Sequence, residues 1–281
     1  MLPTNPYSMR FKLYLRPLRD RQPLLFNYQY PLQSWLYGLL RQADEAYATF
    51  LHQTGYSPAQ STKSFKHFTF SSLHIPRMDR IRPGDTYMTI RSEICTVVLS
   101  FYVEEAAEHF IVGLFQDQRL SLYNHEHQAD FVVERVETLP TDTTWMGTTT
   151  ATFRTLSPMI VADKHNGLDQ YLRPDDEAFA GLFALNLVDK YRSIAPNALP
   201  EMDAHLAERL VRFRLLTEPE RLKVRKMKVK ENKDAETKVV GYHNFQFELT
   251  APAELLEVGY LGGFGRFSSM GNGCCEVMGS G

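Results

Sequence analysis

The sequence is poor in cysteine, has no long apolar run and carries almost no excess charge of either sign. Its 281 residues include only Cys95, Cys274 and Cys275, too few for a disulfide framework and without a second pair for a zinc site. No stretch approaches the roughly 20 uninterrupted apolar residues that span a bilayer. The first residues also lack the apolar core and cleavage site of a secretory signal. We therefore expect a cytoplasmic protein with reduced thiols and no membrane contact.

The remaining composition is that of an ordinary globular protein. Hydrophobic residues make up 43% of the chain and charged residues 23%, so a disordered chain is not expected. The length favours two domains of about 140 residues each. The net charge of −2 is an average, because Lys and Arg concentrate between residues 209 and 230 while acids cluster at 104–108 and 175–177. A local basic patch of this kind leaves room for a polyanionic partner.

Hydrophobic periodicity divides the first half of the chain into strands and helices. Residues 8–17 alternate with a period of two, which predicts a strand. A helix over 32–42 is followed by Asp44 as the N-cap of a second short helix, which Gly55 can terminate. The further predictions are strands at 68–73 and 86–94, a helix at 97–115, and strands at 120–123 and 131–138. This order, β-α-β-β-α-β, is that of a ferredoxin-like domain.

The second half repeats the beginning of that order. We predict a strand at 148–156, a helix at 174–193 with Pro174 in its first turn, strands at 211–217, 222–230 and 239–250, and a short final strand at 274–278. A glycine-rich stretch stands where the second helix is expected, so that helix is predicted to be reduced. The predicted fold is α+β, with two tandem ferredoxin-like domains at residues 1–146 and 147–281.

The glycine-rich stretch near the C-terminus, GYLGGFGRFSSMGNG, is the first candidate binding motif. Glycine permits positive φ angles and lets a phosphate approach bare backbone N–H groups. A dinucleotide-binding loop would lie early in the chain and precede a helix, and a P-loop would end in Gly-Lys-Ser/Thr, so neither fits. A packing turn is the alternative. The predicted RNA-binding residues, which also supply a charge and two hydroxyls, are Gly263, Gly265, Arg266, Ser268, Ser269, Gly271 and Gly273.

A basic strand over residues 222–230, LKVRKMKVK, is the second candidate. Lys223 and Arg225 share one side, and Lys228 and Lys230 follow after a shift of phase that indicates a bulge. A basic strand alone is typical of a solvated face or a protected sheet edge. Beside a phosphate-binding glycine loop, it favours a cradle for RNA.

Histidines could supply chemistry in two places. His125 and His127 would lie on one side of a strand, but no third metal ligand stands at a recognisable spacing, so a surface loop is the better interpretation. His52 ends the second predicted helix, where it could simply interact with the helix dipole. A break at residues 43–44 would fold the two helices together and bring Tyr37 beside His52. Lys66, which enters the next strand, could reach the same place.

These segments together resemble a known family. The runs PLQSWLYGLLRQADEAYATFLHQTGY, FKHFTFSSL and GGFGRFSSMGNG are similar to the CRISPR-associated repeat-processing endoribonucleases, the Cas-six family, of the superfamily named for repeat-associated mysterious proteins. The resemblance covers nearly the whole chain and implies tandem ferredoxin-like domains. It also implies cleavage of the repeat in a long CRISPR transcript, without a metal or other cofactor. The ribose 2′-OH attacks the adjacent phosphate and leaves a 2′,3′-cyclic phosphate and a 5′-hydroxyl.

The resemblance places the family's catalytic residues at His52, Tyr37 and Lys66. An imidazole can act as acid or base near neutral pH. Lys66 would offset developing charge, and Tyr37 would orient a reacting oxygen. His67 is a second candidate for the role of Lys66. One departure concerns the second G-x-G unit, where Asn272 replaces an apolar residue.

The expected partners are repeat RNA, as precursor and as processed guide RNA, subunits of a CRISPR effector complex, and a second copy of the chain. The alternative function is a catalytically silent subunit that holds repeat RNA. The presence of all three catalytic residue types favours cleavage.

Overall fold

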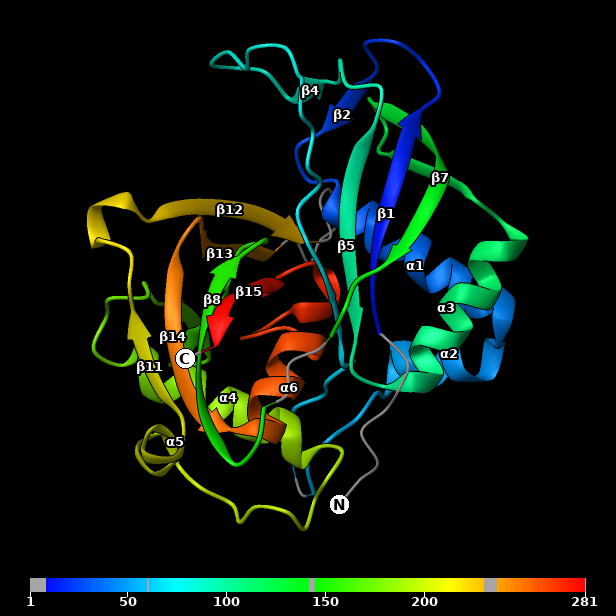
Figure 1. Cartoon of the computed structure of the whole chain (residues 1–281). Helices are drawn as coiled ribbons and strands as arrows, with labels where there is room; N and C mark the ends of the chain where they lie inside the picture. Colours follow the sequence, from blue (N-terminus) through cyan, green and yellow to red (C-terminus); the bar gives the residue numbers. More distant parts are fainter. Residues whose placement is uncertain (1–8, 60, 142–144, 230–236, 281) are drawn as a thin grey trace.

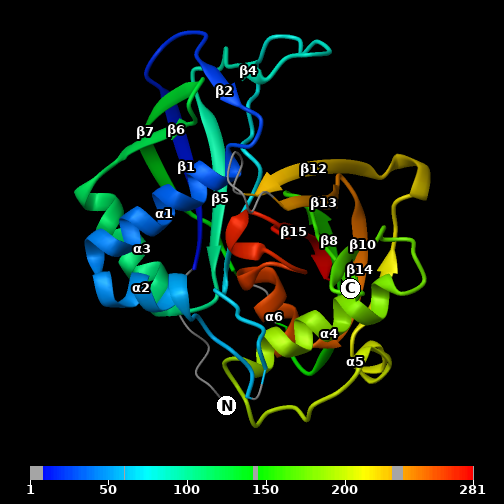
Figure 2. The same cartoon turned by 180° about the vertical axis from the view of Figure 1, so that it is seen from behind.

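The computed structural model describes residues 9–59, 61–141, 145–229 and 237–280. These residues form an α+β fold in which two antiparallel sheets stand side by side, each with helices packed against it (Figures 1 and 2). The N-terminal half comprises the described residues up to 141, and the C-terminal half those from 145. Within the described residues, no helix has the length and apolar character needed to cross a bilayer.

The sheet of the N-terminal half has five strands in the order β3-β5-β1-β7-β6. Strand β1 is confirmed almost as predicted, with Leu13 and Leu15 fully buried on one face. Helices pack against this sheet on the side away from the C-terminal half (Figure 1). The strands are β1 (Arg10–Pro17), β3 (Phe68–Phe70), β5 (Cys95–Phe101), β6 (Arg119–Tyr123) and β7 (Gln128–Thr138).

A helical hairpin follows β1, as predicted. Helix α1 (Gln29–Ala43) begins a few residues earlier than expected, and α2 spans Glu45–Gln53. The Asp44 carboxylate accepts a hydrogen bond from the backbone N–H of Tyr47 at 2.7 Å, which satisfies a free donor of the first turn of α2. The cap thus fixes where the chain reverses.

Two predictions in this half are wrong. Residues 97–115 do not form one helix: they contribute β5, and then α3 (Glu104–Gln116). Only Tyr102 and Val103 separate β5 from α3, and neither Gly nor Pro marks the boundary, so the strand and the helix read as one continuous apolar stretch. The strand predicted at 86–94 shrinks to β4 (Tyr87–Thr89), which pairs with β2 (Pro23–Leu25) outside the main sheet.

The C-terminal half contains a four-stranded sheet in the order β11-β14-β8-β15. Its strands are β8 (Thr148–Thr155), β11 (Arg212–Leu215), β14 (Gln246–Pro252) and β15 (Cys275–Ser280). Helix α4 covers Phe179–Arg192, so Pro174 precedes it and does not lie in its first turn. A short helix, α5 (Ala204–Leu210), was not predicted.

The helix expected before the final strand, which was predicted to be reduced, is longer than predicted. Helix α6 covers Ala253–Gly262 and takes in the first residues of the glycine-rich stretch. The glycine-rich loop proper is therefore residues 263–273, and a short 3₁₀ turn, η2 (Ser268–Met270), lies inside it. The loop follows the helix and does not replace it.

Two hairpins project from the C-terminal sheet. Strands β9 (Ala162–His165) and β10 (Leu168–Tyr171) were not predicted. The predicted strand at 239–250 is broken at Asn244, whose φ is +62°, so β13 (Thr237–His243) pairs with β12 (Lys223–Val229) while β14 joins the main sheet. The β12–β13 register is regular over all described pairs, so the predicted bulge is wrong. A 3₁₀ turn, η1 (Pro219–Arg221), precedes this hairpin.

Buried polar contacts join the two halves. Arg10 of β1 is only 2% exposed, and its guanidinium lies 4.3 Å from the ring centroid of Tyr260 and donates to the Tyr260 carbonyl at 3.3 Å. The Thr69 hydroxyl donates to the Asn272 carbonyl at 2.8 Å. The first contact joins β1 to α6, and the second holds the glycine-rich loop against β3. Cys95, Cys274 and Cys275 are buried free thiols.

Candidate active site

A cleft of about 980 Å³ opens between the α1–α2 hairpin and the glycine-rich loop. It is referred to below as the main cleft. The N-terminal half contributes Tyr37, His52 and Lys66 to its lining, and the C-terminal half contributes residues 265–270 and part of the β9–β10 hairpin. The cleft therefore brings the three predicted catalytic side chains together with one side of the glycine-rich loop.

Tyr37 and His52 are neighbours because the helical hairpin folds α2 back along α1. Their ring centroids are 5.2 Å apart and the ring planes are almost perpendicular. Tyr37 is 8% exposed, and burial raises the pKa of its phenol well above the ordinary value, while a side-chain hydrogen bond with Ser269 opposes that shift. His52, in the last turn of α2, is exposed to the cleft. The pair thus combines a protonated phenol with an accessible imidazole.

Lys66 reaches the cleft through a turn that requires glycine. Its ammonium donates to the His52 carbonyl at 3.3 Å and to the Ser64 hydroxyl at 3.2 Å, and partial burial lowers its pKa. Gly55, just beyond α2, has a φ of +62°, and a Cβ there would come within 2.8 Å of the Lys66 Nζ. The absence of a side chain at Gly55 therefore allows Lys66 to lie against the end of α2, next to His52.

The glycine-rich loop presents only part of its predicted RNA-binding set to the main cleft. Gly265, Arg266, Ser268 and Ser269 line it. Gly263, Gly271 and Gly273 are instead packed inside the protein. A Cβ on Gly273, whose φ is +70°, would overlap the Phe264 carbonyl oxygen at 1.7 Å. The second G-x-G unit is thus required for the path of the chain and is not an open phosphate cradle.

Arg266 already has an anionic partner. Its guanidinium forms a bidentate ion pair with Asp169 of β10, with N–O distances of 2.9 and 3.0 Å. This pair ties the glycine-rich loop to the β9–β10 hairpin. Asp169 was not foreseen from the sequence, because no spacing rule connects it to a loop almost a hundred residues later.

A buried lysine forms hydrogen bonds with the backbone of the first G-x-G unit. Lys190 of α4 is 1% exposed, and its ammonium donates to the carbonyls of Gly263 and, at 3.3 Å, of Gly265. Burial lowers the pKa of Lys190 to about 7. This role of Lys190 could not be predicted, because the residue lies within a helix whose pattern is that of an apolar, buried helix.

His67 does not share the site of Lys66. It is fully buried with a φ of +53°, and its Nε2 lies 2.7 Å from the Ser193 hydroxyl. Burial, together with the nearby charge of Lys190, lowers the pKa of His67 to about 3. The side chain therefore belongs to the packing between the halves, as a neutral imidazole, and the suggestion that it replaces Lys66 is wrong.

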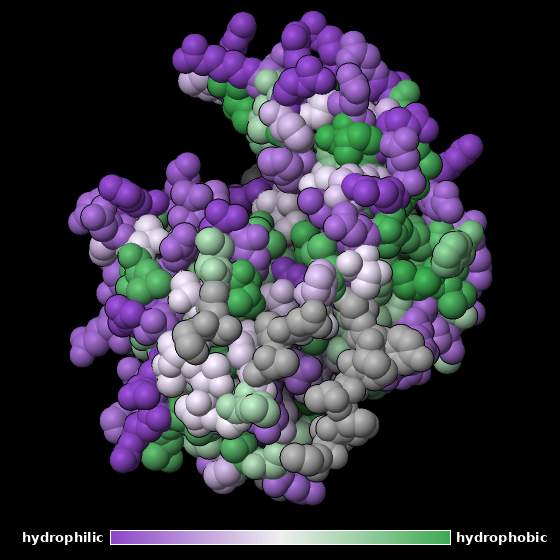
Figure 3. Space-filling model, viewed as in Figure 1, coloured by the Kyte–Doolittle hydropathy of each residue, from purple (hydrophilic) through white to green (hydrophobic). Residues whose placement is uncertain are grey.

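The basic strand faces a different recess. Arg225 and Lys226 of β12 line a groove of about 540 Å³ with residues of the N-terminal half such as Phe26 and Met78. This groove corresponds to the indentation between the β2–β4 end and the β12 strand in Figure 3. Arg225 donates to the Phe26 carbonyl at 2.8 Å and to the Gln29 side chain at 3.1 Å. Lys223 is exposed, Lys228 lies in β12, and Lys230 is outside the described residues.

His125 and His127 lie in the turn between β6 and β7 and not in a strand, in agreement with the surface-loop interpretation. His125 is exposed, whereas His127 packs against Tyr87 with ring centroids 4.5 Å apart. Among the described residues, no group of three or more His, Cys, Asp or Glu side chains is arranged to hold a metal ion.

Two models of known protein families match the chain, one in each half. Residues 23–137 match the family described as "CRISPR-associated protein Cas6, N-terminal", and residues 139–277 match "CRISPR associated protein Cas6, C-terminal". The chain belongs to the Cas6 family. The two matched ranges meet near the junction of the two halves, and each contributes one wall of the main cleft.

Relatives in the Cas6 family match over almost the full length. A protein of Methanocaldococcus jannaschii named "CRISPR-associated endoribonuclease Cas6 1" is 28% identical over 95% of this chain and 91% of its own. The "CRISPR-associated endoribonuclease Cas6" of Pyrococcus furiosus is 25% identical over 97% of this chain and 91% of its own. A Cas6-related structure from Pyrococcus furiosus shares the fold, with a TM-score of 0.76 and 20% identity over 97% of this chain and 99% of that one.

Sequence reasoning missed three cationic residues that line the main cleft: Arg41, Lys63 and Lys164. Arg41 lies one helical turn after Tyr37, so i,i+4 spacing could have identified it. Lys63 pairs with Asp189 at 2.5 Å, and Lys164 belongs to the β9–β10 hairpin. Neither of these two has a periodic sequence signal, because Lys63 lies in a connecting segment and Lys164 in a strand of only four residues.

Proposed function

We propose that the chain is a metal-independent endoribonuclease that cuts CRISPR repeat RNA in the precursor transcript and releases guide RNAs. One observation carries the proposal: Tyr37, His52 and Lys66 of one half line the same cleft as the glycine-rich loop of the other. Membership of the Cas6 family, and the names of the archaeal relatives as endoribonucleases, support it. The substrate strand would lie in the main cleft, across both halves.

The proposed reaction transfers a phosphoryl group within the RNA. The ribose 2′-OH attacks the adjacent phosphorus and the bond from phosphorus to the 5′-oxygen breaks, which gives a 2′,3′-cyclic phosphate and a 5′-hydroxyl. A base must take the proton of the 2′-OH, and an acid must protonate the departing oxygen. Because its raised pKa keeps Tyr37 protonated, the phenol serves as a hydrogen-bond donor and not as the base.

The different exposure of the three side chains, and the pKa shifts of Tyr37 and Lys66, support a different role for each of them in the proposed reaction. His52, the exposed imidazole of the set, takes the proton from the 2′-OH. The Lys66 ammonium, whose pKa is lowered by partial burial, offsets the negative charge that develops on the phosphate oxygens and protonates the departing 5′-oxygen, while Tyr37 orients a reacting oxygen. Cations near the cleft, such as Arg41 and Lys164, would attract the RNA backbone.

We further propose that each half is a ferredoxin-like domain, with the division near residues 146–147. The sheet orders support this proposal. In the N-terminal half β1 lies between β5 and β7, with β3 beyond β5; in the C-terminal half β8 lies between β14 and β15, with β11 beyond β14. Both arrangements are those of a split βαβ unit.

The test is cleavage of repeat RNA, from the CRISPR array of the same genome, by purified protein in excess EDTA. We expect cutting at one position in the repeat, with products that carry a 5′-hydroxyl and a 2′,3′-cyclic phosphate. Cleavage that is lost in EDTA and restored by Mg²⁺ would contradict the metal-independent reaction. Tight binding with no cutting under any condition would instead identify a silent repeat-RNA-binding subunit.

A further inference from the structure

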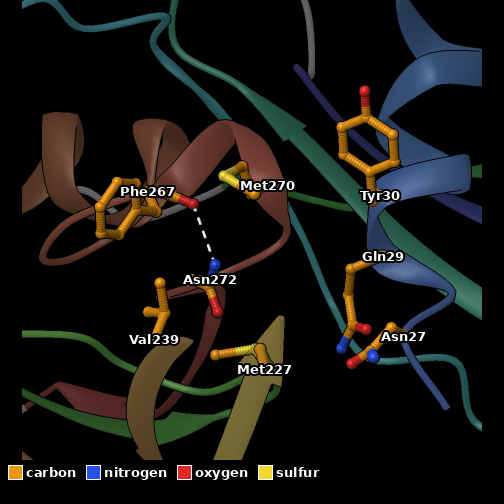
Figure 4. Close-up of a pocket in the computed structure, with 8 residues that line it drawn as sticks. All are labelled: Asn27, Gln29, Tyr30, Met227, Val239, Phe267, Met270 and Asn272. Atoms are coloured by element: carbon orange, nitrogen blue, oxygen red, sulfur yellow. Dashed lines mark hydrogen bonds between the residues drawn. The ribbon is translucent and has the colours of Figure 1, made fainter. Parts of the chain in front are cut away.

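A small pocket lies beside the main cleft, where the two halves meet (Figure 4). Its walls come from the start of α1, the β12–β13 hairpin and the glycine-rich loop. Tyr30, Phe267 and Met270 line both this pocket and the main cleft, so the two are continuous. A strand bound in the main cleft would therefore pass the mouth of the pocket.

Two buried amide side chains in this pocket each have one atom without a hydrogen-bond partner among the described residues. These atoms are the Nε2 of Gln29, which is 6% exposed, and the Oδ1 of Asn272, which is 3% exposed. Neighbouring groups fix both orientations. Arg225 donates to the Oε1 of Gln29 at 3.1 Å, and the Nδ2 of Asn272 donates to the Phe267 carbonyl at 3.1 Å (Figure 4). The pocket thus presents one free donor and one free acceptor.

An orphaned donor and an orphaned acceptor in a buried site are costly to leave unpaired, so the pocket is suited to a polar occupant. Its remaining walls are largely apolar, formed by side chains such as Met227, Val239 and Phe267. A flat ring with a donor and an acceptor on one edge combines these two properties. Every RNA base has such an edge.

We propose that Gln29 and Asn272 read the edge of one base of the bound RNA. The inference rests on the proposed function, because it requires an RNA strand in the main cleft. The Gln29 Nε2 donates to an acceptor on the base, and the Asn272 Oδ1 accepts from a donor. Since the two residues belong to different halves, the base is read only by the assembled pair of halves.

The side chains around the pocket allow a base to enter. The pocket measures about 20 Å³, room for one water molecule. Met227 and Met270 form part of its wall, and unbranched methionine side chains adapt to irregular occupants. Met270 lines both the pocket and the main cleft, so a different rotamer of this side chain would widen the opening between them. Only the edge of the base has to enter the pocket to reach Gln29 and Asn272.

The test is selection from a pool of randomised single-stranded RNA by the wild-type protein and by three variants. Gln29→Leu and Asn272→Leu each remove one reading atom. At one position of the selected motif, we expect them to lower the preference for the favoured base about tenfold, as loss of a specific base contact does, and to leave the other positions unchanged. Gln29→Glu keeps the acceptor for Arg225 but turns the free donor into a second acceptor. It should shift that position toward guanine, whose edge offers two adjacent donors.

The control is Gln116→Glu, an exposed position on α3 outside both cavities, and it should select the wild-type motif. Thermal unfolding shows whether each Leu variant is folded, and Gln29→Glu gives a gain of preference that misfolding cannot mimic. If all variants select the same motif, the two amides hold a water molecule only and the inference is wrong. If the wild-type protein selects no RNA, the proposed function fails as well, so the two failures are distinguishable.

Discussion

The rings of Tyr37 and His52 lie edge to face, with centroids 5.2 Å apart and planes at 83°. One long helix would have held the two residues far apart. The break at Asp44 folds α2 back along α1, and the Asp44 carboxylate caps the second helix. The cap therefore creates the site: it places a buried phenol and an exposed imidazole side by side at the edge of a cleft that the other half completes.

Replacement of His52 by alanine should separate cutting from binding. The His52 side chain is exposed in the main cleft and contributes no described hydrogen bond to the fold, so His52→Ala should remain folded and bind repeat RNA normally. Loss of the general base should slow cleavage by about 10²–10⁴-fold. Single-turnover cleavage and binding assays measure the two effects. His125→Ala, in the exposed β6–β7 turn, is the matched control; wild-type cutting by His52→Ala would show that another group is the base.

A methyl group at Gly55 should displace Lys66. The Cβ of Gly55→Ala would lie 2.6 Å from the Phe65 carbonyl oxygen and 2.8 Å from the Lys66 Nζ, at a φ of +62° that disfavours alanine. We expect a slower cleavage step with RNA affinity almost unchanged.

Gly38→Ala is the control for Gly55→Ala, because nothing lies within 4 Å of a Cβ there and the residue is inside α1. It should raise the free energy of unfolding by about 0.5–1 kcal/mol and leave cleavage intact. Equal cleavage rates in the two variants would mean that the position of Lys66 does not matter.

His67 should make the protein sensitive to acid. Its pKa is about 3 in the folded protein, below the ordinary value of about 6.5 that applies after unfolding. Between these values the unfolded chain binds the proton and the folded protein does not. The free energy of unfolding therefore falls as the pH drops through this window, by up to about 1.4 kcal/mol per pH unit.

His67→Asn removes this titration, and asparagine tolerates the left-handed backbone at this position. Denaturant unfolding from pH 7 to pH 3 should show a flatter dependence for the variant than for the wild-type protein. Parallel curves would mean that His67 is protonated in the folded state.

The basic hairpin should contribute to RNA affinity through its exposed lysines. Lys223→Gln combined with Lys226→Gln should weaken binding and reduce the slope of log affinity against log salt by about 0.7 for each lost phosphate contact. Arg225→Gln should act differently, because Arg225 holds Phe26 and Gln29 in place. An unchanged salt slope for the lysine variant would place the RNA away from this hairpin.

Much of the local structure could be predicted from the sequence. The strand β1, the α1–α2 hairpin and the Asp44 cap follow from alternation, helical spacing and capping chemistry, which depend on nearby residues. The proximity of Tyr37 and His52 followed from the same signals. Part of the run that forms β5 was misread as helix, because only two residues without Gly or Pro separate β5 from the apolar residues of α3.

Partners distant in the sequence could not be predicted. Arg266 has the composition of a phosphate ligand, but its charge is matched by Asp169, and Lys190 holds the glycine-rich loop from within an apolar helix. Gly271 and Gly273 have positive φ angles, as their residue type suggests, yet they serve packing. Residue type indicates the chemistry available to each side chain. Its hydrogen-bond or ion-pair partner becomes known only from the three-dimensional structure.

The most direct test of the central claim is a comparison of two repeat RNAs that differ only by a 2′-deoxy substitution at the cut site. If the 2′-OH is the nucleophile, the wild-type protein should bind both RNAs with equal affinity but cut only the ribose form. Cleavage of the deoxy RNA at the same position would show that water or another group attacks the phosphate, and would contradict the proposed reaction.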